Sequence, residues 1–184
     1  MFKGKFDRLK KANWKLVASV GFAVFWVYGM LTLTAVFGST VSLDVANSFV
    51  GFAKGYSSLF VANQNFTAFF IILNNMLVFT LMLYVPYNIS VAFTGFIIGC
   101  VLKVEGLVGV AVLPVLGSLY VQPFAIFELG AYVVAITVAI YGRLHDRGCY
   151  EEEDEFRWST KYLLAVMVGF LMLMIAGQLE AALL

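Results

Sequence analysis

The chain has 184 residues, of which 62% are hydrophobic and only 12% are charged. Soluble domains are closer to half apolar and a quarter charged, so this composition excludes an ordinary soluble protein. The formal net charge of +1 gives no basis for binding nucleic acid. Apolar runs of about 20 residues, the length that crosses a hydrocarbon core, recur along the sequence. We therefore expect one polytopic membrane domain over residues 1–184, with the lipid bilayer as its main partner.

The N-terminal segment, residues 1–15, is basic, with six lysines or arginines against a single aspartate. An apolar run follows from Leu16 to Phe37. It is longer than the hydrophobic region of a usual signal peptide, and no small-x-small cleavage site closes it. We therefore expect this run to be retained as the first membrane span.

Residues 41–62 carry a different pattern, in which large apolar side chains recur at helical spacing and small or polar ones occupy the opposite side. This pattern predicts an amphipathic helix with Ser42 or Asp44 near its N-cap. We expect the helix to lie along the outer membrane interface, with Phe49, Phe52 and Tyr56 inward and Lys54 toward water. A tilted span that lines a polar interior is the alternative.

Four more apolar runs have the composition of membrane spans, and they cover residues 66–85, 89–102, 123–141 and 158–178. Pro123 suits the first position of a helix. Residues 107–120 are also apolar, but they are short and hold Pro114 and Gly117, so we expect a short re-entrant or interfacial helix. The predicted fold is an all-α integral membrane protein: a bundle of about five transmembrane helices, with an amphipathic interfacial helix and a short re-entrant or interfacial helix.

The one long polar segment is the loop 142–161, which holds four basic residues and the acidic run 151–155. Ten of the twelve basic residues lie in this loop or in the N-terminal segment 1–15, which places both in the cytoplasm by the positive-inside rule. With four spans before the loop and one after it, the C-terminus lies outside. We expect the acidic run to be a solvated loop, with a docking site for a basic partner as the alternative.

Two cysteines and one histidine give no catalytic or metal site in this sequence. Cys100 falls near the outer end of its span and Cys149 in the cytoplasmic loop, so we expect two free thiols. His145 lies in the same loop, where a solvated histidine is expected. The sequence holds no phosphate-binding glycine loop and no nucleophile–base pair. We therefore expect neither enzymatic activity nor a cofactor.

Polar residues inside the apolar runs are candidates for an intramembrane polar site. Asn74 and Asn75 lie in the middle of the 66–85 run, and Thr94 lies in the next run. Adjacent residues on a helix point about 100° apart, so the two asparagines cannot both face the same neighbour squarely. Hydrogen bonding between helices is the expected role, at roughly 1 kcal/mol per bond. A polar permeation path is the alternative.

Glu128 is the most costly of these residues, because it lies five residues after Pro123 in an otherwise apolar run. At a rise of about 1.5 Å per residue, it lies roughly 8 Å from the start of the helix. One hypothesis is a structural lock, in which Glu128 accepts hydrogen bonds from Asn74, Asn75 or the short helix. The other is a cation or proton site on a transport path. Glu180, near the outer end of the last span, is expected to reach the interface.

Gly95 and Gly99 form a small-xxx-small pattern, which predicts close packing of that span against a neighbouring helix. The pattern is frequent in apolar helices, so it predicts packing and not a particular partner.

Four segments resemble, in order, the motifs of the stage II sporulation protein M family, and they are residues 70–75, 94–99, 123–128 and 177–181. The third is the most specific, because it is similar to a Pro-His-Gly-Ile-x-Glu signature, with Phe124 and Ala125 in place of His and Gly. The second is similar to an Asn-Gly-x-x-x-Gly motif, with Thr94 in place of Asn. The resemblance covers about residues 15–184.

The resemblance implies a small helical membrane protein of five or six spans. In spore-forming bacteria the family member is a scaffold of the engulfment machinery that holds cell-wall hydrolases, and these two properties are not carried over to this chain. We expect a non-enzymatic, multi-pass cell-membrane protein that serves as a scaffold or assembly subunit, as a homo-oligomer or with other membrane proteins. A small ion or solute transporter or channel, using Glu128 and the intramembrane asparagines, is the alternative.

Overall fold

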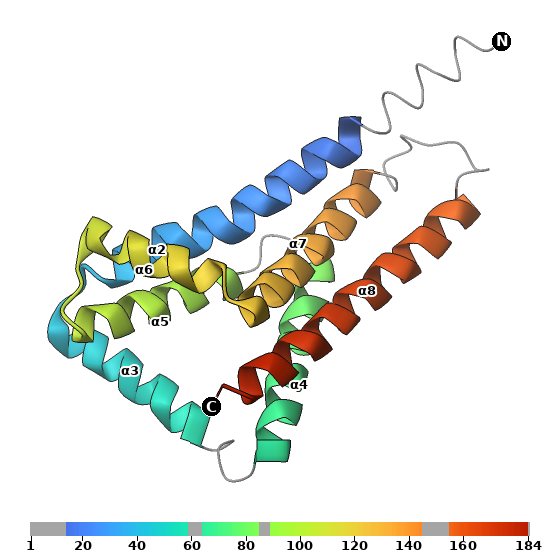
Figure 1. The fold of residues 1–184 in the computed structure, drawn as a ribbon. Helices are drawn as coiled ribbons and strands as arrows, with labels where there is room; N and C mark the ends of the chain where they lie inside the picture. Colours follow the sequence, from blue (N-terminus) through green and yellow to red (C-terminus); the bar gives the residue numbers. More distant parts are fainter. Residues whose placement is uncertain (1–13, 59–63, 85–88, 145–154, 184) are drawn as a thin grey trace.

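The computed structural model of the protein describes residues 14–58, 64–84, 89–144 and 155–183. Within these residues the chain is built of helices, without strands (Figure 1). Three helices are long and apolar enough to cross a membrane, and a fourth crossing is reached if one bent helix pair counts as a single span. The all-helical class is therefore confirmed and the helices are compatible with a membrane protein. The count of about five spans stays a prediction.

The first helix, Trp14–Gly38, is one of the three candidate spans. It contains a π-helical turn, η1 (Phe25–Gly29), which is followed by α2 (Met30–Gly38). π-helical turns are rare in proteins, and those that occur often lie at functional sites. Here η1 packs against α7, a helix from the second half of the chain. The preceding residues, 1–13, which hold most of the basic N-terminal segment, lie outside the described residues.

The amphipathic segment forms α3 (Leu43–Ser58). The hydroxyl of Ser42 accepts a 3.4 Å hydrogen bond from the backbone N–H of Val45, so Ser42 is the N-cap. In Figure 1 this helix runs transverse to α2 and α8, from the end of α2 towards the start of α4. Its position in the membrane interface stays a prediction.

The buried face of α3 is made by small residues and not by the two phenylalanines alone. Ala46 and Val50 are buried against α5 (Ser90–Val104). Phe49 packs edge-on against Phe96 of α5, with ring centroids 5.0 Å apart. Phe52 remains 63% exposed, and the expected position of both phenylalanines towards the membrane interior stays a prediction.

The chain turns sharply after α5. The 3-10 turn η2 (Gly109–Val112) and α6 (Leu113–Tyr120) follow, and together they are bent by 102° relative to α5. Gly106, with a φ of 88°, allows the turn because only glycine adopts such a conformation readily. The expected short helix is therefore present, and its re-entrant or interfacial position stays a prediction.

The helices form two groups (Figure 1). In the first group, α2 and α3 pack against α5, and η2 and α6 close onto α2. The second group consists of α4 (Gln64–Tyr84), α7 (Pro123–Leu144) and α8 (Glu155–Ala181), which pack against one another. Contacts of η1 and α6 with α7 join the two groups. Most of the charged loop, residues 145–154, lies outside the described part of the chain, together with His145 and Cys149.

Close contacts define the relative directions of the helices. Gly177 of α8 lies against Ile72 of α4, and Gly169 of α8 lies against the ring of Phe79 of α4. As the numbers rise on α4 they fall on α8, so these two helices are antiparallel. On α5, Gly95 lies against Leu31 of α2 and Gly99 lies against Ala35, so the residue numbers rise together and α2 and α5 run parallel. These directions are compatible with five alternating spans.

Candidate functional site

Glu128 lies in the second turn of α7, which begins at Pro123 as expected. The phenol of Tyr132 donates a 2.9 Å hydrogen bond to Oε1 of Glu128. Residues four apart on a helix lie on the same face, so α7 itself supplies this partner. The lock hypothesis expected a partner from Asn74, Asn75 or the short helix, whereas this hydrogen bond is made within one helix.

Glu180, in the last turn of α8, is the second carboxyl at this place. It interacts electrostatically with both Glu128 and Tyr132. We call Glu128 and Glu180 the acidic pair. Sequence reasoning treated the two residues separately, although a signal was present: α7 and α8 are consecutive helices joined by a loop. In such an antiparallel pair the first turns of one helix lie beside the last turns of the other.

Asn75 is only 5% exposed, in the buried stripe of α4 that also holds Ala68, Phe79 and Met82. Asn74 is exposed, and its Nδ2 donates a 3.3 Å hydrogen bond to Oδ1 of Asn75. Nδ2 of Asn75 has no hydrogen-bond partner among the described residues. A buried amide without a partner is costly in an apolar environment.

Thr137 of α7 is a second buried polar residue in the same helix group. Its hydroxyl oxygen also has no hydrogen-bond partner within the part of the chain that the structure describes. It lies more than two turns beyond Glu128 on α7, so we do not include it with the acidic pair.

Thr94 is not brought together with Glu128 and the asparagines. It is exposed on α5, in the first helix group. The neighbouring Gly95 and Gly99 face α2: a Cβ on Gly95 would meet the backbone of Leu31, and one on Gly99 would meet the carbonyl of Ala35. The two glycines therefore permit the close approach of α2 and α5, and Thr94 lies beside this contact and not in a polar site.

Three contacts that sequence reasoning missed, two hydrogen bonds and one ring contact, hold the short helix in place. The hydroxyl of Ser39 accepts a 2.8 Å hydrogen bond from the backbone N–H of Gly109. The hydroxyls of Thr32 and Tyr120 lie 2.6 Å apart and share a hydrogen bond, and the ring of Tyr28 packs edge-on against that of Tyr120. The paired residues lie 70 or more positions apart, so no local pattern in the sequence signals them.

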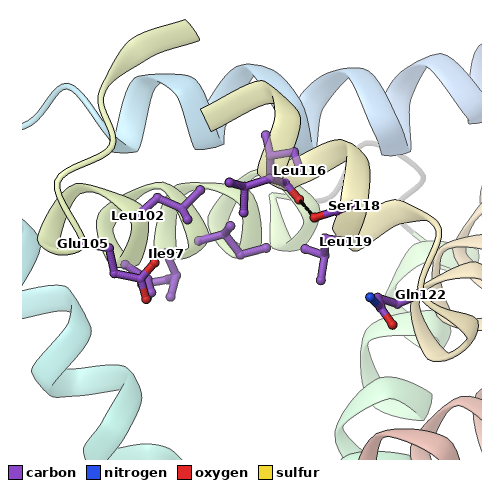
Figure 2. A pocket seen from close by; sticks show the side chains of 10 residues that line it. Ile97, Leu102, Glu105, Leu116, Ser118, Leu119 and Gln122 are labelled. Atoms are coloured by element: carbon purple, nitrogen blue, oxygen red, sulfur yellow. Dashed lines mark hydrogen bonds between the residues drawn. The ribbon is translucent and has the colours of Figure 1, made fainter. Parts of the chain in front are cut away.

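A groove of about 380 Å³ lies between α5 and α6 (Figure 2). Its walls are mainly aliphatic, and its polar residues are Glu105, Ser118 and Gln122. Figure 2 shows Glu105 at one end of this groove and Gln122 at the other. The hydroxyl of Ser118 is used locally, since it donates to the backbone carbonyl of Val115 at 2.7 Å.

In the described part of the chain, no three His, Cys, Asp or Glu side chains gather. Cys100 is a buried free thiol whose Sγ lies 3.8 Å from the carbonyl oxygen of Gly38, at the end of α2. No protein-family model matches the chain, and no curated protein or solved structure is significantly similar to it. The resemblance to the stage II sporulation protein M family therefore stays a proposal.

Proposed function

We propose that the protein is a non-enzymatic membrane scaffold or an assembly subunit of a membrane complex, as its resemblance to the stage II sporulation protein M family implies. One observation supports this proposal most. Only 22% of the apolar window of Trp14–Gly38, and 22% of that of Thr160–Ala181, is buried within the chain, against 44% for Pro123–Gly142. Two of the spanning helices therefore present most of their surface outward.

The outward surface of α8 is continuous along the helix. Exposed apolar side chains recur every three or four residues, which places them on one face, and they are Leu164, Met167, Leu171 and Met174. Helices in membranes associate through packing of such faces and through interhelical hydrogen bonds. We assign this face, the α8 outer stripe, to contact with a second copy of the chain or with another membrane protein.

The proposal includes a topology in the cell membrane. Five spans cross it, α3 lies along the outer interface, the N-terminus is cytoplasmic and the C-terminus is outside. The clustering of ten of the twelve basic residues in the N-terminal segment and the 142–161 loop supports this orientation. The antiparallel packing of α4 on α8 is compatible with it.

Site-specific photocrosslinking in intact membranes tests the scaffold proposal. A photoreactive residue at Leu171, which is 57% exposed, should form an adduct of defined size with a second copy or another membrane protein. Leu173, which is fully buried, is the matched control and should react only within the chain. Adducts with lipid alone along the whole α8 outer stripe would contradict the proposal.

A small ion or solute transporter is the second candidate. The observation in its favour is the acidic pair, which lies in the same helix group as the buried Asn75. Ionisable residues within membrane spans often mark ion or proton pathways. Measurement of flux decides between the two candidates.

A further inference from the structure

The short helix α6 returns alongside α2, from the end of that helix towards its middle. Gly109, at the start of the returning segment, bonds to Ser39 at the end of α2, and Tyr120, at the end of α6, bonds to Thr32. At a rise of about 1.5 Å per residue, Thr32 lies roughly 10 Å before Ser39 along α2. Under the topology proposed above, on which this inference rests, α2 ends at the outer surface. α6 then runs from that surface into the bilayer as a re-entrant helix.

The groove between α5 and α6 has one end at the same outer surface. α5 runs parallel to α2, with Gly99 against Ala35, and Glu105 follows the last residue of α5. Glu105 therefore lies level with the end of α2. Figure 2 shows Glu105 at one end of the groove and Gln122, just after α6, at the other. The groove thus leads from a carboxylate at the outer surface towards the membrane interior.

The helices α5 and α6 do not fill the space between them. They follow one another in the chain, but the bend of 102° makes them diverge, and η2 and α6 pack more closely against α2 than against α5. The side chains leave a groove of about 380 Å³. Packed proteins contain few voids larger than a water molecule. A space of this size inside a bilayer is therefore filled by another component.

The walls of the groove suit an acyl chain. Between the two ends they are made by aliphatic side chains, among them Ile98 and Val101 of α5 and Val115 and Leu119 of α6. Ser118, the polar residue in this part, uses its hydroxyl proton for a hydrogen bond within α6. A hydrated ion or a polar solute would exchange water for aliphatic surface there, which is costly. An acyl chain gains dispersion contacts along the whole wall.

Glu105 sets the preference for a headgroup. It is exposed, and among the residues that the structure describes no ion pair or hydrogen bond engages its carboxylate. Lys103 lies about 200° away around α5 and does not line the groove. The mouth of the groove therefore carries a negative charge. A primary ammonium group donates charge-assisted hydrogen bonds to such a carboxylate, whereas a quaternary ammonium has no N–H to donate and an anionic headgroup is repelled.

We propose that the groove binds one acyl chain of a bilayer phospholipid whose headgroup carries a primary ammonium group, of the phosphatidylethanolamine type. The ammonium group donates to Glu105 at the outer surface, and the acyl chain lies along the aliphatic walls. Gln122 limits the groove at its inner end, because a carboxamide is a poor contact for an acyl chain. The bound lipid fills the space between α5 and α6 and braces the re-entrant helix.

Photolabelling of the purified full chain in mild detergent tests the site. The probe is phosphatidylethanolamine with a photoreactive group at the end of one acyl chain, and mass spectrometry maps the labelled peptides. The label should concentrate on residues 97–105 and 115–122. Unlabelled phosphatidylethanolamine should compete at a concentration about two- to fivefold lower than phosphatidylcholine with the same acyl chains, which is the preference expected from an exposed ion pair.

Two pairs of variants test the two parts of the site. Glu105→Gln should make the two competing lipids equal, whereas Asp44→Asn, which removes an exposed carboxylate on α3, should keep the preference. Ser118→Phe places a ring in the groove and should reduce its labelling several-fold. Val121→Phe enlarges an exposed residue that does not line the groove and should leave the labelling unchanged. Both phenylalanine variants change exposed positions, so the buried core is left intact.

Label spread evenly over the lipid-facing helices, or equal competition by the two lipids in the wild type, would overturn the proposal. A groove that stays unlabelled because a second copy or another protein covers it would overturn it as well. The α8 outer stripe takes no part in this measurement. Failure of the scaffold proposal, which crosslinking at Leu171 measures, is therefore distinguished from failure of the lipid site.

Discussion

The hydroxyl of Ser39, at the end of α2, accepts a hydrogen bond from the backbone N–H of Gly109, the first residue of η2, over 2.8 Å. The first N–H groups of a helix have no partner within that helix. Ser39 is completely buried, and through this partly buried hydrogen bond it caps the start of the short helix. This one contact ties the returning segment to the end of the first helix.

Ser39→Ala should destabilise the protein by about 0.5–1.5 kcal/mol, because it removes the partly buried hydrogen bond to the N–H of Gly109. Ser118→Ala is the matched control: that hydroxyl is exposed and bonds only to Val115 in its own helix. The control should change the free energy of unfolding by less than about 0.5 kcal/mol. Equilibrium unfolding in mild detergent compares the two, and equal losses would show that the cap is unimportant.

Gly99→Ala should separate α2 from α5, because the added Cβ would meet the backbone of Ala35. Overpacking of this kind costs about 1–3 kcal/mol. Gly117→Ala is the control, since a Cβ there meets nothing within 4 Å and α6 should gain about 0.5–1 kcal/mol. Thermal unfolding of the purified variants measures both effects. A Gly99→Ala variant as stable as the wild type would contradict the close packing of these helices.

Local signals in the sequence predicted much of the fold. Pro123 marks the start of α7, and the break after α5 and the short helix that follows are both present. These features depend on backbone preferences that act over a few residues. The apolar pattern of α3 predicted a helix but not its packing face, because Phe52 is equally suited to lipid and to protein contact.

The candidate site could be predicted only in part. Glu128 stood out because a carboxylate in an apolar run is costly wherever it points. Its neighbours, Tyr132 and Glu180, depend on which face of α7 meets α8, and periodicity alone does not give that face. The burial of Asn75 and the exposure of Asn74 likewise depend on which face of α4 packs against the other helices.

The topology predicts opposite locations for the two ends of the chain. In a variant without its native cysteines, a cysteine at Leu183, which is exposed, should react with a membrane-impermeant reagent in intact cells. A cysteine at Phe2 should react only after permeabilisation. Native Cys149, restored alone, is the cytoplasmic control and should behave like position 2. Labelling of both ends from the same side would exclude five spans.

Cation and proton flux into liposomes that contain the purified protein is the decisive measurement for the scaffold proposal. A scaffold should give flux no greater than that of protein-free liposomes at any pH, and Glu128→Gln should give the same result, since the acidic pair then serves structure and not transport. Flux in the wild type that Glu128→Gln abolishes, while the variant keeps its fold, would contradict the account and identify the protein as a transporter.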